Sequence, residues 1–145
     1  MKFPHYAAAA LLALSPLVFV HPVRVSGDSM APALKDGQVA LALRPWCSGK
    51  PALGEIRLFN GPEGRAIKRV LALPGQALEL RNGYLTRGGG YVDEPYVSHR
   101  DLSMGGPWQA GGGYLLLGDN RPVSRDCRLW GPVRAGDMGG RVLFH

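Results

Sequence analysis

The chain has 145 residues, enough for one domain with a hydrophobic core and too few for two domains of ordinary size. Its 21 glycines and 12 prolines divide the sequence into short apolar runs, which excludes an architecture of long helices and predicts a mostly β domain. The formal net charge is +6, but Arg and Lys are scattered singly, without a basic stripe. This distribution argues against a nucleic-acid partner and is compatible with an anionic membrane surface.

The first element along the chain is an uncharged apolar run, Tyr6 to Val20, with Lys2 in front of it. Fifteen helical residues rise about 22 Å, less than the roughly 30 Å hydrocarbon core, so length alone also fits a signal-peptide core. No small-x-small cleavage site follows the run, which favours a retained anchor. A helix extended to Phe3 or Val23 would supply the missing length.

We therefore predict a membrane anchor at residues 1–23 and a β-rich domain at residues 24–145. The positive-inside rule, applied to Lys2, places the second part on the outer face of the membrane.

Alternating apolar residues predict about seven strands after the anchor. A two-residue hairpin turn is expected at Asn82 and Gly83, and the Gly-rich segment from His99 to Gly113 is expected to be a loop. The strands fall in the ranges 38–43, 54–59, 66–73, 76–81, 84–92, 113–120 and 140–145. Short strands at such intervals predict an antiparallel β-sandwich or barrel-like fold.

The cysteines and histidines predict neither a metal centre nor a dithiol redox site. Cys47 and Cys127 lie 80 positions apart and form no CxxC motif. The histidines show no HxxxH spacing; they are His5, His21, His99 and His145. We expect no metal ion, and the sequence leaves a disulfide between the two cysteines open.

A serine stands in the turn SGDSMAPAL, residues 26–34, soon after the apolar run. Such a serine is ordinarily a solvated hydroxyl, and it becomes a nucleophile only when a base takes its proton. A neutral lysine serves as that base, and Lys68 lies in the predicted strand AIKRVLAL between Ile67 and Val70. Apolar neighbours lower the pKa of a lysine amine. The alternative is a lysine that reaches into solvent from a strand edge.

A third segment, GDNRPVSRDCRLWGPV, residues 118–133, is dense in charge. Loops of this kind are usually solvated. The alternating signs also suit Asp–Arg pairs that would hold a rigid loop.

The order of these three segments behind an apolar run resembles the successive sequence boxes of type I signal peptidases. GGGYVDEPYV, residues 88–97, and GDMGGRVLF, residues 136–144, are also similar to segments of that family. The resemblance implies a β-rich catalytic domain that hydrolyses one peptide bond through an acyl-enzyme. The implied partners are signal peptides of secreted preproteins, with small residues at positions −1 and −3, and membrane lipids; no metal or organic cofactor is implied.

Carried over by position, the resemblance implies that Ser29 is the nucleophile and that Lys68, 39 positions later, is its general base. The backbone N–H of Ser29 is the implied oxyanion donor. Gly27 stands where some members carry a second, hydroxyl donor, so that donor is not expected here. The implied supporting residues are Ser124, which helps to orient the lysine amine, and Asp119, Asp126 and Arg128, while Met30 and Pro32 shape the turn.

Three other interpretations remain. One is a relative that serves conjugative transfer and cuts dedicated substrates. Another is a self-cleaving repressor of the SOS type, disfavoured because the apolar residues before Ser26 cannot form a helix-turn-helix. The third is a membrane-anchored binding domain without catalysis, and intact Ser29 and Lys68 argue against it.

Overall fold

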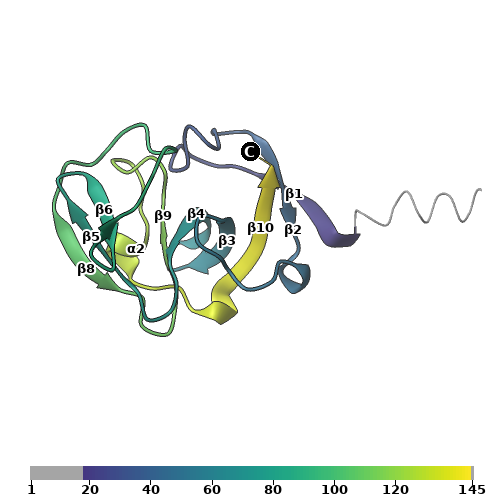
Figure 1. Ribbon diagram of the computed structural model, residues 1–145. Helices are drawn as coiled ribbons and strands as arrows, with labels where there is room; N and C mark the ends of the chain where they lie inside the picture. Colours follow the sequence, from purple (N-terminus) through teal and green to yellow (C-terminus); the bar gives the residue numbers. More distant parts are fainter. Residues whose placement is uncertain (1–17, 145) are drawn as a thin grey trace, which may run out of the picture.

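The computed structural model describes residues 18–144 and arranges ten strands in two antiparallel sheets (Figure 1). The strands are β1 (Val20–Arg24), β2 (Val39–Leu43), β3 (Ile56–Gly61), β4 (Gly64–Ala72), β5 (Ala77–Arg81), β6 (Tyr84–Arg87), β7 (Gly90–Tyr91), β8 (Gly105–Gln109), β9 (Leu115–Leu117) and β10 (Met138–Phe144). Short helical turns are η1 (Pro45–Cys47), α2 (Cys127–Trp130) and η2 (Ala135–Asp137). The predicted mostly β, antiparallel architecture is confirmed. The predicted N-terminal apolar helix lies almost entirely outside the described residues.

The larger sheet has the strand order β1-β2-β10-β3-β4-β9. Its β3–β4 hairpin places Arg57 opposite Lys68 and closes where Gly61 pairs with Gly64. β9 pairs with β4 only over Arg69–Ala72, so the first half of β4 has one open edge. β1 is one of the two outer strands of this sheet, and it also has an open edge.

The smaller sheet has the order β7-β6-β5-β8 and lies at the opposite end of the molecule from β1 and β2 (Figure 1). Its β5–β6 hairpin turns at Asn82 and Gly83, whose φ angles are 51° and 80°, and Arg81 pairs with Tyr84. The hairpin predicted from the Asn-Gly pair is thereby confirmed.

The prediction of a loop from His99 to Gly113 is wrong in the middle of the segment, at residues 105–109. β8 lies within this segment and pairs antiparallel with β5. Its sequence GGPWQ lacks apolar alternation, so only the distant partner strand reveals it. The glycine at 106 has a φ of +99°, and a Cβ there would lie 2.8 Å from the carbonyl oxygen of Leu78. The close approach of β8 to β5 therefore requires glycine at this position.

β1 begins inside the segment expected to form the anchor. Val20 pairs with Leu43 and Arg24 with Val39, so a helix extended to Val23 is wrong: these residues hydrogen-bond to β2 instead. No helix within residues 18–144 is long and apolar enough to cross a membrane. The division at residues 23 and 24 stays a prediction.

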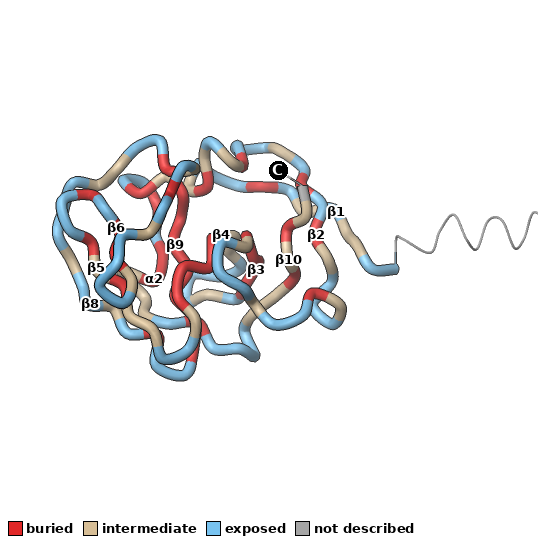
Figure 2. Tube along the Cα trace, viewed as in Figure 1, coloured by how far each residue is buried: buried red, intermediate tan, exposed pale blue. Residues whose placement is uncertain are grey.

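The buried apolar residues form two clusters in the core. Figure 2 marks the buried positions along the chain in red. The larger cluster includes Val70, Leu78 and Leu116 from both sheets. The smaller one packs Met30 and Leu34, which are 1% and 0% exposed, against the larger sheet. The turn that carries Ser29 is therefore fixed to the sheet by its own apolar side chains.

Candidate active site

Ser29 lies in a tight turn between β1 and β2. The N–H of Ala31 donates to the carbonyl of Asp28 at 3.0 Å, and the N–H of Leu34 donates to the carbonyl of Met30 at 2.9 Å. Because the Met30 side chain is buried directly after Ser29, the serine is held at the boundary between core and solvent, half-buried.

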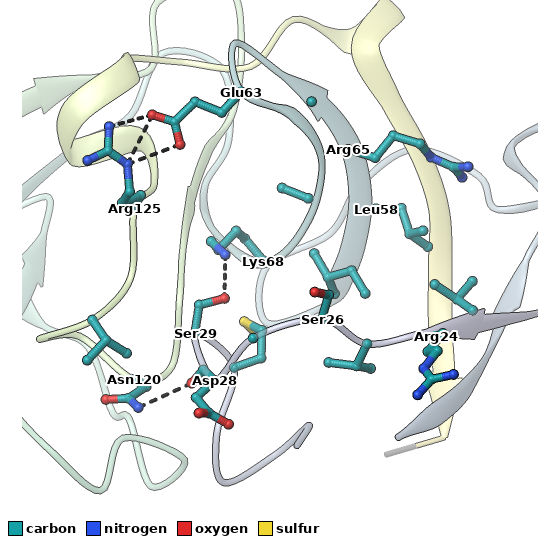
Figure 3. Close-up of a pocket in the computed structure, with 18 of the residues that line it drawn as sticks. Arg24, Ser26, Asp28, Ser29, Leu58, Glu63, Arg65, Lys68, Asn120 and Arg125 are labelled. Carbon is teal, nitrogen blue, oxygen red and sulfur yellow. Dashed lines mark hydrogen bonds and ion pairs between the residues drawn. The ribbon is translucent and has the colours of Figure 1, made fainter. Parts of the chain in front are cut away.

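Lys68 reaches the same point from β4. Its Nζ lies 2.6 Å from the Oγ of Ser29, within hydrogen-bond distance (Figure 3). The residue is 5% exposed, so its amine is shielded from water by the sheet and by the Ser29 turn. This geometry permits direct proton transfer between the hydroxyl and the amine.

The surroundings of Lys68 favour its neutral form. Burial lowers the pKa of the amine from its ordinary value of 10.5, while the carboxylates of Asp126 and Asp119 act in the opposite direction. Both carboxylates are engaged by arginine side chains, which reduces their pull on the ammonium. Burial is therefore the dominant effect on the lysine.

Asp119 is bound by Arg69, the residue after Lys68 in β4. Arg69 donates from Nε to Oδ1 at 2.9 Å and from Nη2 to Oδ2 at 2.6 Å, a bidentate pair with a fully buried carboxylate. The guanidinium also lies 4.0 Å from the ring centroid of Tyr96. This pair ties the loop after β9 to the lysine strand. Sequence reasoning did not assign Arg69 to the site, although it is adjacent to Lys68.

Asp126 organises the other end of that loop. Its carboxylate accepts hydrogen bonds from the Ser124 hydroxyl at 2.7 Å, the Gly118 N–H at 3.0 Å and the Arg128 Nε at 2.9 Å. The same carboxylate caps the N-terminus of α2 through the N–H of Arg128. The predicted charge pairs of this loop are therefore present.

A second buried ion pair was missed by the sequence analysis. Arg121 binds the carboxylate of Glu94 with both terminal nitrogens, and its Nε donates to the carbonyl of Gly118 at 3.0 Å. Glu94 and Arg121 are both at most 2% exposed. Glu94 belongs to the segment GGGYVDEPYV, so the family resemblance was the one signal that pointed to it.

Three further residues predicted for the site are Ser124, Met30 and Pro32. Ser124 lies at the site, but its hydroxyl bonds to Asp126; within residues 18–144 the hydrogen bond of the Lys68 amine goes to Ser29. Pro32 is exposed within the turn. Met30 is buried, and it also lines the groove over Ser29 and Lys68.

Both cysteines are free thiols, which answers the disulfide question that the sequence left open. Burial raises the pKa of the Cys127 thiol to about 11. Cys127 is therefore neutral near neutral pH and adds no negative charge beside Lys68.

A groove of about 810 Å³ opens over Ser29 and Lys68 (Figure 3). β1 and the first half of β4 line it, and both of these segments have an open strand edge. Its apolar lining includes Met30, Leu58 and Ile67. Exposed backbone groups beside an apolar floor suit an extended peptide that adds as a strand.

Comparison with known proteins decides the family. The family described as signal peptidase, peptidase S26, matches the chain over residues 3–145. The chain belongs to this signal peptidase family. The relatives it resembles include signal peptidase IB of Staphylococcus aureus, 32% identical over 86% of this chain and 76% of that protein. A probable signal peptidase I-1 of Synechocystis is also 32% identical, over 99% of this chain and 80% of that protein.

A solved signal peptidase I agrees with the fold. The crystal structure of the Enterococcus faecalis protein is 31% identical to this chain, with a TM-score of 0.54, and covers 65% of this chain and 97% of that one. The signal peptidase family and its antiparallel β architecture are thus supported by both sequence and structure.

Proposed function

We propose that the protein is a membrane-anchored serine endopeptidase that removes N-terminal signal peptides from secreted preproteins. The observation that carries the proposal is the 2.6 Å contact between the Ser29 hydroxyl and the buried Lys68 amine, at the floor of a groove with two open strand edges. Family membership supplies the substrate class, since the named relatives are signal peptidases.

The chemistry begins at Lys68. Its neutral amine takes the proton of the Ser29 hydroxyl as Oγ forms a bond to the scissile carbonyl carbon. The N–H of Ser29 donates to the resulting oxyanion, a contact worth about 3 to 4 kcal/mol to the transition state. The lysine ammonium then protonates the leaving amine, and the C–N bond breaks. A water molecule, deprotonated by the same lysine, hydrolyses the acyl-enzyme and regenerates Ser29. No metal or organic cofactor takes part in these steps.

The substrate would lie in the groove as an extended strand. The open edges of β1 and β4 offer it backbone hydrogen bonds, and shallow apolar positions near Met30 and Ile67 would select small side chains at −1 and −3. Residues 1–23 are proposed to anchor the chain, with residues 24–145 as the catalytic domain on the outer face of the membrane.

Cleavage of a preprotein with an alanine-x-alanine site, in detergent, tests the proposal. We expect wild type to cut after the second alanine and Ser29→Ala and Lys68→Ala to lose this activity, because one removes the nucleophile and the other the base. The matched controls are Ser26→Ala and Lys35→Ala, which alter an exposed serine and an exposed lysine beside the same turn and should retain cleavage. Full activity in Ser29→Ala or Lys68→Ala would refute the dyad. Processing only of one dedicated substrate would indicate the conjugative-transfer relative.

A further inference from the structure

Asn120 contacts the backbone on both sides of Ser29. Its side-chain Nδ2 donates to the carbonyl of Asp28 at 3.1 Å (Figure 3), and its backbone N–H donates to the carbonyl of Ser29 at 3.0 Å. One residue of the loop after β9 thus holds two successive carbonyl groups of the nucleophile turn.

These two bonds fix the orientation of the peptide units that flank the Cα of Ser29. A peptide unit is planar and trans, so its C=O and N–H point in opposite directions. Holding the carbonyl of Asp28 therefore aims the N–H of Ser29 away from Asn120. Holding the carbonyl of Ser29 fixes the next plane, and with both planes fixed the φ and ψ angles of Ser29 are set. The direction of its Cα–Cβ bond, and so the path of Oγ toward Lys68, follows from these angles.

The N–H of Ser29 donates no hydrogen bond to any residue in the described part of the chain, 18–144. It is the donor available to a developing oxyanion. Gly27, two residues earlier, contributes no side-chain hydroxyl, and apart from its two chain neighbours no described residue has an atom within 4 Å of the place where its Cβ would be. Stabilisation of the oxyanion therefore depends strongly on how well a single backbone N–H is aimed.

We propose that Asn120 is a positioning residue for the reaction: its side-chain amide orients the Asp28–Ser29 peptide so that the Ser29 N–H meets the oxyanion while Oγ faces Lys68. The inference rests on the proposed peptidase function, and Asn120 itself does not touch the reacting atoms.

Steady-state cleavage of an alanine-x-alanine peptide provides the first test. Asn120→Ala removes the amide, and Asn120→Asp keeps its size but puts an oxygen where the donor was. Both should lower kcat about 10- to 100-fold with KM changed less than about twofold, because the lost alignment matters only in the transition state. Asn60→Ala is the matched control: it removes the same amide from an exposed asparagine at the end of β3, so its kcat should equal that of wild type.

The second test compares the binding of a peptide aldehyde with the binding of the corresponding alcohol. A purely structural role of Asn120 would leave the ratio of these two affinities unchanged. Ser29 Oγ adds to the aldehyde carbon, and the former carbonyl oxygen takes the position of the oxyanion, whereas the alcohol binds without this bond. Wild type and Asn60→Ala should bind the aldehyde far more tightly than the alcohol. In Asn120→Ala and Asn120→Asp this preference should fall by about the same factor as kcat. Thermal unfolding of each variant shows whether the protein remains folded, and if Asn120→Ala unfolds, Asn120→Asp carries the test.

The outcomes separate this inference from the proposed function. Active wild type, with Asn120 variants whose kcat and aldehyde preference match those of Asn60→Ala, would overturn the role of Asn120 alone. A lower unfolding temperature with an unchanged aldehyde preference would likewise overturn it, since Asn120 would then be structural. Wild type that neither cleaves the peptide nor prefers the aldehyde would overturn the proposed function and this inference with it.

Discussion

Lys68 occupies a position in which its charge works against folding. Burial lowers the pKa of its amine below 10.5, the ordinary value that the unfolded chain approaches. Between the two pKa values the unfolded chain binds more protons than the folded protein, so the free energy of unfolding rises with pH across this window. Below the folded pKa the protein carries a buried ammonium and its full destabilising effect. The residue proposed as the general base is thus expected to lower stability.

Lys68→Met should therefore stabilise the protein at neutral pH while abolishing cleavage, because methionine keeps the unbranched shape without the amine. The gain in unfolding temperature, about 3 °C for each kcal/mol in a domain of this size, should be largest below the folded pKa and shrink toward pH 10.5. Thermal unfolding across this pH range measures it. Lys35→Met, at an exposed lysine, is the control and should change little. A Lys68→Met variant less stable than wild type at every pH would contradict this account.

At the scale of elements, the loop between β9 and α2 is held in place by two buried carboxylates near Lys68, each of which is paired with an arginine. Arg69 fixes Asp119 to β4, and Arg128 with Ser124 fixes Asp126 at the start of α2. These contacts join segments up to 50 positions apart in the sequence. They also engage the two carboxylates that raise the pKa of Lys68, and so weaken the pull of these carboxylates on the lysine ammonium. The loop therefore joins distant segments of the fold, and its carboxylates also affect the pKa of Lys68.

Arg69→Met should destabilise the protein by about 3–5 kcal/mol, because it leaves the fully buried Asp119 carboxylate without its partner. The freed negative charge should also raise the pKa of Lys68 and shift the rise of activity to higher pH. Urea unfolding and a pH–rate profile measure the two effects. Arg81→Met is the matched control, since Arg81 pairs with Glu79 at the surface and should contribute little. Equal destabilisation by the two substitutions would contradict the assignment of Arg69 as the buried partner of the Asp119 carboxylate.

At the scale of the whole molecule, local patterns predicted local structure and missed long-range pairing. The Asn82–Gly83 turn was predictable because a two-residue turn of this type determines its own geometry. β8 was not, because GGPWQ becomes a strand only against β5. Ser29 and Lys68 were found through the order of sequence segments, and the structure brings them together. Arg69 and Asn120 were missed because their roles depend on contacts with residues far away in the sequence.

The proposed anchor at residues 1–23 predicts how the protein binds to membranes. The 145-residue chain should float with phospholipid vesicles and stay bound in about 1 M salt, because an inserted apolar segment is insensitive to ionic screening. Attraction of a chain with net charge +6 to anionic lipid would be lost under these conditions. Vesicles of neutral lipid serve as the control and should bind the chain equally well. Release by salt would show that surface charge, and not an anchor, holds the protein.

The measurement that tests the central claim most directly is the pH dependence of kcat/KM for wild type, with Lys68→Arg in parallel. If the neutral amine of Lys68 is the base, wild-type activity should rise tenfold per pH unit below the pKa of Lys68 and level off above it, at a pH under 10.5. Lys68→Arg should be inactive throughout, because a guanidinium stays protonated. A flat wild-type profile from about pH 6 to 10, or activity in Lys68→Arg, would contradict a lysine base at Ser29.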